Sequence, residues 1–320
     1  MLVERTSANS EGRGDQKVAV LVVGGSGFIG GTVVQSLTKR GIETIGYDLI
    51  HTNLADSQKN WIRADILEMQ SIERTFFEYN IDSIVHLVGL PAIDYCQKNP
   101  HFSFLLNVMS VQNTLEAMRM ADIPKIVFAS SATVYGNSNG RALKETDETR
   151  PDTVYGWHKL LAEDAIRAYA DAYGIQSTIL RLFNVYGGDP KIGKEVVSIF
   201  IKRGLKSEPL IVRGPEKYRD FVHIEDVAEA FARSVTGNHN KSVTLNIGTG
   251  IRTTLKQLAL IVNSHFPQSK VIVEDVSDDG TGLIANATSA KKVLGFSARN
   301  SKIGIADHVK KYAKRNTREA

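Results

Sequence analysis

Short runs of apolar, β-branched residues alternate with longer segments of helical periodicity over the first 184 residues. The runs are VAVLVVGG, TIGYD, DSIVHLVG, KIVFASS and STILRLFN, and segments such as GTVVQSLTKRG separate them. Continuous apolar strands that are separated by helices are typical of a parallel sheet with helices on both faces. The sequence therefore predicts an α/β chain built on a doubly wound parallel sheet.

This alternation changes after Asn184, where loops, helices and isolated strands follow in no regular order. It returns briefly in FVHIEDVAEAFARSV and VTLNIG. The polar N-terminus shows no apolar periodicity, as is usual for flexible chain ends. We expect three parts: a flexible leader, 1–16; a sheet domain, 17–184 and 221–248; and a smaller, discontinuous α/β lobe, 185–220 and 249–320.

The composition excludes several classes of protein. The net charge of +4 comes from 39 basic and 35 acidic residues, and the surplus lies after Val309, so no basic face for nucleic acid is expected. The single cysteine, Cys96, can form no internal disulfide or Cys-rich zinc site, and we expect it to be buried. No run approaches the about 20 apolar residues of a membrane span. We expect a cytoplasmic protein with no metal and no membrane partner.

A glycine-rich loop, GGSGFIG, directly follows the first predicted strand and precedes a helical segment. Its glycines at positions 24, 27 and 30 allow a tight turn and the close approach of a pyrophosphate, while the helix N-terminus supplies free amides. Asp48 ends the second predicted strand, where a carboxylate accepts hydrogen bonds from an adenosine ribose. The same acid repels a 2′-phosphate, so the sequence favours NAD over NADP.

A second acidic residue, Asp65, follows a third short strand in WIRADI. Two interpretations are open at this point. In the first, Asp65 and Ile66 contact the adenine of the dinucleotide. In the second, the carboxylate of Asp65 caps the helical segment that follows it.

Tyr155 and Lys159 lie near the start of a helical segment, VYGWHKLLAEDAIRAYADAYG, and their spacing of four places them on one face. A free tyrosine has a pKa of about 10. We expect the lysine ammonium, together with an oxidised nicotinamide ring, to lower the pKa of this phenol. Ser131 follows the predicted strand KIVFA at the carboxyl edge, where such sheets bind ligands. These residues predict hydride transfer coupled to proton transfer.

Several motifs in a fixed order resemble the extended short-chain dehydrogenase/reductase family, in particular its nucleotide-sugar epimerases and dehydratases. They are GGSGFIGG, HLVG, SSATVYG, YGWHK, RLFNVYG, RDFVHIEDVA and LNIGTG. The resemblance implies a Rossmann domain, NAD as the cofactor, a nucleotide-diphosphate sugar as the substrate and a catalytic triad of Ser131, Tyr155 and Lys159. It implies a cofactor site lined by Gly24, Gly27, Phe28, Ile29, Gly30, Asp48, Asp65, Ile66, Val88, Asn107, Tyr155, Lys159 and Phe183. It also implies substrate contacts from Ser131 and Thr133 to the hexose and from Asn184 and Arg219 to the diphosphate.

The same resemblance implies that Tyr155 takes a proton from a sugar hydroxyl while hydride moves to NAD, which yields a keto-sugar. Dehydratases of the family carry Asp and Glu after the active hydroxyl, and decarboxylating relatives carry Glu at the second place. This chain has Ala132 and Thr133 there. The pattern favours an isomerase, a nucleotide-diphosphate-hexose 4-epimerase that works through a transient 4-keto sugar. A dehydratase or a keto-sugar reductase of the family is the alternative, and a non-catalytic NAD-binding protein is the third.

The chain departs from the epimerase pattern on the substrate side. Epimerases of the family carry an arginine before the segment that corresponds to ANATSAKK, and no arginine lies between Lys270 and Lys291. The segment RGPEKYRDF is also one residue shorter before Arg219, and Pro91 replaces a lysine of close glucose/galactose epimerases. The way in which the diphosphate is bound and the identities of the nucleotide base and the sugar are therefore open.

Two long helical segments, from Phe102 to Met120 and from Val154 to Tyr173, carry many apolar residues. These residues can pack within one protomer or beyond it. Members of the family often pair through such helices as a four-helix bundle. The resemblance therefore implies a homodimer.

Overall fold

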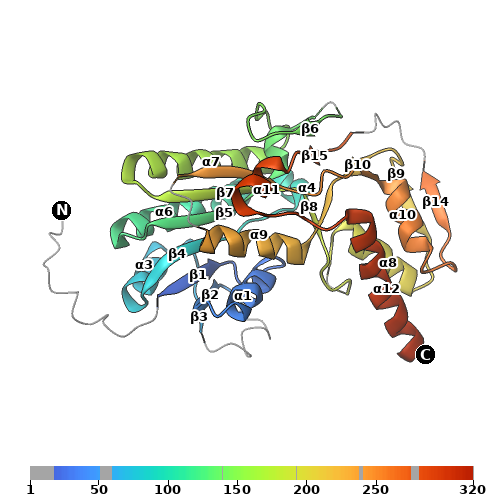
Figure 1. Ribbon diagram of the computed structural model, residues 1–320, viewed down its shortest axis with the longest axis horizontal. Coiled ribbons are helices and arrows are strands. Elements are labelled where there is room, and N and C mark those ends of the chain that lie inside the picture. Colours follow the sequence, from blue (N-terminus) through green and yellow to red (C-terminus); the bar gives the residue numbers. More distant parts are fainter. Residues whose placement is uncertain are drawn as a thin grey trace, which may run out of the picture.

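The computed structural model describes residues 18–50, 60–138, 140–191, 193–237, 241–274 and 281–319, so the predicted leader lies outside the described residues. A parallel sheet of seven strands forms its centre (Figure 1). In spatial order the strands are β12 (Val243–Ile247), β7 (Gln176–Leu182), β5 (Lys125–Ser131), β4 (Ile81–His86), β1 (Ala19–Val23), β2 (Thr44–Asp48) and β3 (Trp61–Arg63). The predicted doubly wound Rossmann-type sheet is confirmed. Its strand order reverses between β1 and β4, and such sheets bind ligands beyond the carboxyl ends of their strands at this point.

Strand β1 shows why the central strands read as continuous apolar runs. All its residues are buried, because side chains that alternate along a strand reach both faces of the sheet. Leu21 and Val23 pack into the hydrophobic cluster on one face. Val20 and Val22 pack into the cluster on the other face. Both faces are therefore covered, and β1 carries no polar side.

Helices cover the two faces of the sheet separately. The cluster that contains Leu21 also receives residues of α3 (Met69–Glu78), α6 (Ser110–Ala121) and α7 (Val154–Tyr173). The cluster that contains Val22 receives residues of α1 (Gly30–Lys39), α9 (Ile224–Thr236) and α11 (Thr288–Leu294). Helix α11 thus packs against the central sheet although it lies late in the chain.

A separate hydrophobic cluster forms a smaller body at one end of the molecule (Figure 1). It is built from α8 (Val196–Leu205), β9 (Leu210–Arg213), α10 (Leu255–Asn263), β14 (Val271–Glu274) and α12 (Ser301–Glu319). Strands β9 and β14 pair in parallel. Three short strand pairs complete the fold: β8 (Asn184–Tyr186) with β11 (Phe221–His223), β10 (Tyr218–Arg219) with β13 (Thr253–Thr254), and β6 (Ala142–Leu143) with β15 (Ile284–Ala285).

The helical segment predicted from Phe102 to Met120 is helical but not uniform. It follows α4 (Ile93–Lys98) and consists of α5 (Pro100–Phe104), a π-helical turn (Leu105–Met109) and α6. A π turn bonds each amide to the carbonyl five residues earlier, and such turns are rare and frequent at functional sites. Asn107 lies in the middle of this turn. Hydrophobic periodicity alone could not distinguish it from an ordinary α-helix.

The helices of the described residues include none that is long and apolar enough to cross a membrane.

Replacement of Phe231 by Ala tests the packing of α9 on the sheet. The Phe231 side chain is fully buried, and the loss of a buried phenyl ring typically costs about 3–5 kcal/mol. We expect a decrease of this size in the free energy of unfolding, measured by urea denaturation. Phe77 is 64% exposed on α3 and serves as the control, since its replacement by Ala should change that free energy by less than about 0.5 kcal/mol.

Candidate active site

The glycine loop after β1 leaves no space for side chains. Gly24 has a positive φ of 85°, and a Cβ there would lie 2.8 Å from the backbone nitrogen of Val88. A Cβ on Gly30 would overlap with the backbone oxygen of Gly24. The amide of Gly27 donates to that same oxygen at 3.1 Å, which closes the turn. No side chain caps the N-terminus of α1, and the amides of Gly31 and Val33 already bond to the backbone oxygens of Gly27 and Ile29.

Asp48 lies beside this loop, at the end of β2 as predicted. Its carboxylate accepts hydrogen bonds from the amide of Ser26 at 3.0 Å and from the amide of Ile50 at 3.1 Å. The residue therefore fixes the loop and places a negative charge next to it. The position agrees with the ribose contact expected from the sequence.

Asp65 and Ile66 both make contacts within the fold. The Asp65 carboxylate accepts a hydrogen bond from the amide of Leu67 at 2.9 Å, so it caps the turn before α3. Ile66 is 5% exposed and packs into the hydrophobic cluster under the sheet. Asp65 therefore caps a turn, while the N-cap residue of α3 is Glu68, and the adenine contact of Asp65 and Ile66 stays a prediction.

Helix α7 presents Tyr155 and Lys159 to the end of β5. It begins after Thr153, whose hydroxyl accepts a hydrogen bond from the amide of Gly156 at 3.1 Å. Tyr155 and Lys159 are 8% and 4% exposed. The Tyr155 hydroxyl is hydrogen-bonded to Ser131, and the Lys159 ammonium donates to the backbone oxygen of Ala129 at 2.9 Å. The two helix residues and the strand-end serine therefore form one buried cluster.

Thr133 belongs to the same cluster. Its hydroxyl lies 2.9 Å from the hydroxyl oxygen of Ser131, and its amide donates to that oxygen at 3.2 Å. Ser131 thereby caps a short 3₁₀ turn, Ala132–Tyr135. The hydroxyl groups of Ser131, Thr133 and Tyr155 lie together at the carboxyl edge of the sheet.

The lowering of the Tyr155 pKa that we expect from Lys159 and a bound nicotinamide ring stays a prediction. Burial raises the pKa of Tyr155 to about 12, and the hydrogen bond to Ser131 only partly opposes this effect. Burial also lowers the pKa of Lys159 to about 8, against the charge of Glu163. The reason is that the phenol and the ammonium are both removed from water. Sequence spacing reveals the pair, but it does not reveal the loss of solvent.

The segment that follows β4 joins the glycine loop to the Tyr–Lys cluster. Val88 is half-buried and contacts Gly24, as described above. A Cβ on Gly89 would lie 3.0 Å from the Lys159 ammonium and 2.8 Å from the side-chain oxygen of Asn107. The predicted residues Gly24, Val88, Asn107 and Lys159 are therefore brought together.

Phe28, Ile29 and Phe183 have different surroundings. Phe28 is 47% exposed, and its ring contacts Gly188, in the loop after β8. Ile29 packs against the cluster that contains Val22. Phe183 is 5% exposed and packs in a small cluster with residues of the 3₁₀ turn next to Ser131.

On the predicted substrate side, the buried Asp220 lies directly after Arg219 and is bonded to Asn184. Asp220 is fully buried and accepts hydrogen bonds from Thr249, Gly250 and Ala285. Its backbone oxygen accepts from the amide of Asn184 at 2.9 Å. The Asp220 carboxylate is therefore used inside the fold. The Arg219 guanidinium donates to the backbone oxygen of Tyr218 at 2.8 Å.

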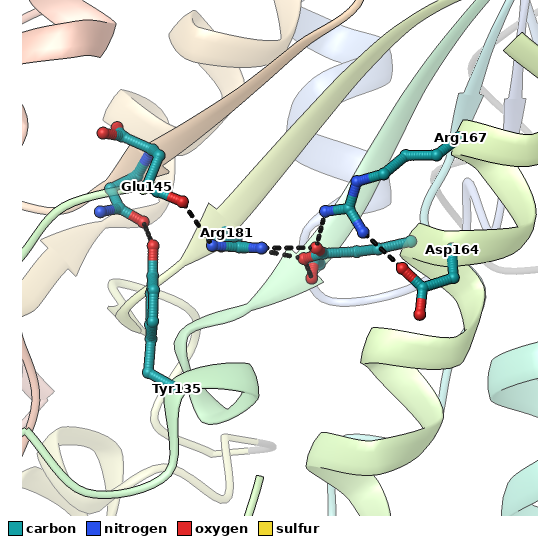
Figure 2. Close-up of polar contacts among 8 residues, drawn as sticks. Tyr135, Glu145, Asp164, Arg167 and Arg181 are labelled. Carbon is teal, nitrogen blue, oxygen red and sulfur yellow. Dashed lines mark hydrogen bonds and ion pairs between the residues drawn. The ribbon is translucent and has the colours of Figure 1, made fainter. Parts of the chain in front are cut away.

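The sequence did not predict the charged network beneath this site (Figure 2). Glu163 is one turn beyond Lys159 on α7 and is fully buried. Arg181 of β7 donates two hydrogen bonds to its carboxylate, at 2.7 and 3.0 Å, and Arg167 donates another. Ser130, next to Ser131, also donates to it. The sequence could have indicated that Glu163 lies on the same helix face as Lys159, because the two are four residues apart. It contains no signal that pairs Glu163 with Arg181 on a distant strand.

The same network extends toward the end of the sheet. The Arg181 guanidinium lies 4.8 Å from the ring centroid of Tyr135 and donates to the backbone oxygen of Glu145 at 3.3 Å (Figure 2). The Tyr135 hydroxyl donates to the side-chain oxygen of Asn246 at 2.7 Å. These contacts tie α7, β5, β7 and β12 together directly under the hydroxyl cluster.

Comparison with known proteins shows one family. The model described as "NAD dependent epimerase/dehydratase family" matches residues 20–248. The chain is 36% identical over 250 residues to a putative UDP-glucose 4-epimerase of Methanocaldococcus jannaschii, which covers 76% of this chain and 81% of that protein.

Solved structures agree in fold. The Thermus thermophilus UDP-glucose 4-epimerase in complex with NAD has a TM-score of 0.82 and 28% identity, over 91% of this chain and 99% of that chain. The Thermotoga maritima UDP-glucose 4-epimerase with UDP-glucose has a TM-score of 0.84 and 26% identity, over 94% and 99%.

Replacement of Glu163 by Gln tests the buried network. Burial alone would raise the pKa of Glu163, but the hydrogen bonds and charge of Arg181 outweigh it and hold that pKa below its ordinary value. Ionised Glu163 therefore stabilises the fold above about pH 4.3, the pKa of an unfolded Glu, and this contribution is lost as the pH falls through the folded pKa. We expect Glu163→Gln to lower the free energy of unfolding by about 3–5 kcal/mol at neutral pH and by less in acid.

The neighbouring substitution Asp164→Asn is the control, because that side chain is 62% exposed. It should change the free energy of unfolding by less than about 0.5 kcal/mol. Equal stability of wild type and Glu163→Gln at neutral pH, measured by urea denaturation, would contradict the assigned role of the ion pair.

Proposed function

Because the chain belongs to the NAD dependent epimerase/dehydratase family, we propose that it is an NAD-dependent nucleotide-diphosphate-sugar 4-epimerase, an isomerase that works through a transient 4-keto sugar. The observation that carries the proposal is the buried Tyr155 hydroxyl, which lies beside Ser131 and one helical turn from Lys159. Relatives and structural neighbours named as UDP-glucose 4-epimerases support this activity. Ala132 and Thr133 supply no carboxylic acid for the elimination of water, which supports an epimerase over a dehydratase.

The glycine loop fits a dinucleotide. Its backbone is wound so tightly that Gly24 and Gly30 have no room for a Cβ, and no acidic side chain lies in the first turn of α1. The Asp48 carboxylate beside Ser26 suits the hydroxyls of an adenosine ribose. We assign the cofactor site to this loop, Asp48 and the segment that contains Val88, with Asn107 and Lys159 beside it.

Within this site, Tyr155 is the group that takes up and returns the proton. As a phenolate, its oxygen accepts the proton of the sugar 4-hydroxyl and later returns it. Ser131, hydrogen-bonded to Tyr155, orients this oxygen and the sugar. When bound, NAD would supply the acceptor and later the donor of the sugar hydride, together with a positive charge near the phenol.

Lys159 favours the formation of the Tyr155 phenolate near neutral pH. Burial raises the pKa of Tyr155 to about 12, so the phenolate needs nearby positive charge. With a pKa of about 8, Lys159 is mostly protonated at pH 7 and supplies such a charge. Its hydrogen bond to Ala129 holds the ammonium at the end of β5. We assign sugar binding to Thr133 and diphosphate binding to Asn184 and Arg219.

We propose a homodimer formed through one exposed apolar surface, called here the helical patch. Its side chains come from α4, α5 and α7 and are 37–50% exposed: Tyr95, Phe102, Phe104, Trp157 and Leu161. Contiguous apolar surface of this kind is typical of interaction sites in soluble proteins. Both helical segments that the sequence indicated contribute to the patch, which supports pairing of two copies.

The domain division and the cellular location expected from the sequence are proposals as well. We divide the chain into a cofactor domain, 17–184 and 221–248, and a substrate lobe, 185–220 and 249–320. We also place the protein in the cytoplasm, on the support of its single cysteine, since disulfides are rare in that compartment.

Replacement of Tyr155 by Phe tests the assigned reaction. It removes the hydroxyl and keeps the ring, so we expect the turnover of the responsive sugar to fall by about 10²- to 10⁴-fold while NAD binding is kept. Activity is measured with UDP-, GDP-, dTDP- and CDP-sugars, with product stereochemistry read by NMR and cofactor by absorbance. Tyr79→Phe, at the exposed end of α3, is the control.

Full turnover by Tyr155→Phe would defeat the catalytic assignment. A product that has lost water would instead indicate a dehydratase. Consumption of one NADH for each product would indicate a keto-sugar reductase. Binding of NAD without conversion of any sugar would indicate the non-catalytic alternative.

Replacement of Leu161 by Glu tests the helical patch. Leu161 is 45% exposed, and a buried, unpaired carboxylate at an interface is strongly unfavourable. We expect sedimentation velocity to show a dimer for the wild type and a monomer for Leu161→Glu. Leu260→Glu, on α10 and 51% exposed, should remain dimeric. A wild-type protein that sediments as a monomer at micromolar concentration would refute the proposed pairing.

A further inference from the structure

A chain of buried polar groups begins at His158, the residue between Tyr155 and Lys159 that the mechanism does not use. The Nδ1 atom of His158 lies 2.8 Å from the hydroxyl of Ser103 on α5. The side-chain nitrogen of Asn107, in the π turn, donates to that hydroxyl at 3.2 Å. The amide of Leu90 donates to the side-chain oxygen of Asn107 at 3.0 Å. Ser103 and Asn107 are fully buried, and His158 is 9% exposed.

The hydrogens of this chain can be assigned. The oxygen of Ser103 accepts from Asn107, so its own hydrogen is free to point toward His158. Burial lowers the pKa of His158, which leaves the imidazole neutral and Nδ1 free to accept that hydrogen. Every link then has one donor and one acceptor, from Leu90 through Asn107 and Ser103 to His158. The side-chain nitrogen of Asn107 also donates to the backbone oxygen of Leu90 at 3.4 Å, so the Asn107 amide group is held by Leu90 on one side and by the Ser103–His158 pair on the other.

The backbone of Leu90 is held by side chains at both of its polar atoms. Its amide is bound by Asn107, and its oxygen accepts from the thiol of Cys96 at 3.2 Å. The preceding residues Val88 and Gly89 contact Gly24 on one side and Lys159 on the other. The position of this segment, residues 87–90, thus sets the distance between the glycine loop and the catalytic lysine.

The π turn is a second sign that the contacts of Asn107 matter. It interrupts the α-helical hydrogen bonds between α5 and α6 at the turn that carries Asn107. A π turn is rare, because its hydrogen-bond geometry is less favourable than that of an α-helix, and it persists where other contacts compensate. The bonds of Asn107 to Ser103 and to Leu90 are such contacts.

We propose that His158 is a positioning residue: through Ser103 it fixes the Asn107 amide group, and through Asn107 it fixes residues 87–90 between the glycine loop and Lys159. His158 itself contacts neither substrate nor cofactor in this proposal. The inference rests on the proposed function for the identity of the cofactor. Its direct consequence is a tighter binding of NAD, which can be measured without any sugar.

Three variants distinguish the effect of the hydrogen-bond acceptor of His158 from the effect of the size of its side chain. His158→Leu keeps a side chain of similar length and removes the acceptor. His158→Asn places an amide oxygen near the position of Nδ1 and restores it. Ser103→Ala breaks the same chain one link further on. His101→Asn, also on α5 but exposed, is the matched control.

The first measurement is the dissociation constant of NAD from protein freed of nucleotide. Loss of one buried hydrogen bond corresponds to an increase of about tenfold. We expect this increase in His158→Leu and in Ser103→Ala, with no further increase when the two are combined. His158→Asn should stay within about twofold of the wild type, and His101→Asn should be unchanged.

The second measurement is hydrogen exchange of the backbone, followed by mass spectrometry. Peptides that contain residues 87–92 should exchange faster in His158→Leu and Ser103→Ala than in the wild type. Peptides of the central strands should be unaffected, which distinguishes a local effect from general destabilisation. If His158→Leu fails to fold, the milder Ser103→Ala and the rescue variant His158→Asn still decide the question.

Unchanged NAD affinity and unchanged exchange in folded His158→Leu or Ser103→Ala would overturn the proposal. A His158→Asn protein as weak as His158→Leu would overturn it as well. If these measurements agree with expectation but no nucleotide sugar is converted, the proposed epimerase function fails and the positioning role of His158 stands.

Discussion

A positive and a negative charge lie one helical turn apart in α7, at Lys159 and Glu163, and both are removed from solvent. Burial of an unpaired charge is strongly unfavourable, so each charge depends on what the fold places opposite it. Glu163 receives Arg181 from β7 and Ser130 from β5, and Lys159 receives the backbone oxygen of Ala129. These partners draw α7 onto the carboxyl end of the sheet, and the position of Tyr155 follows from that contact.

The lobe beyond the sheet depends on a comparable arrangement around Asp220. This buried carboxylate binds backbone or side-chain donors from Thr249, Gly250 and Ala285, while its own backbone oxygen binds Asn184. Segments far apart in the sequence therefore meet at one residue. Burial raises the pKa of Asp220, and the hydrogen bonds from Thr249 and its neighbours oppose this effect. The proposed substrate contacts from Asn184 and Arg219 flank this junction.

Features of the fold that depend on nearby residues were predicted from the sequence. The apolar run of β1, the strand end at Asp48 and the full extent of α7 all follow from alternation, turn chemistry and helical spacing. The π turn at Asn107 did not, because its side chains repeat much as in an α-helix. The bond between Ser103 and His158 joins residues far apart in sequence, and no periodicity links them. The burial that raises the pKa of Tyr155 was not predicted either, because spacing does not report the loss of solvent.

Most faces of helix α7 make contacts within the protein over its first turns. Tyr155, Lys159 and Glu163 reach the sheet, His158 reaches α5, and Trp157 and Leu161 form exposed apolar surface. A typical surface helix has one free face on which substitutions accumulate without effect. In this stretch the free face is narrow: Trp157 and Leu161 on it are apolar, and Asp164 is the next exposed position. Few positions can therefore change without effect. Over evolutionary time it should change more slowly than α12, a helix of similar length that is anchored along one side by Ile305 and Val309.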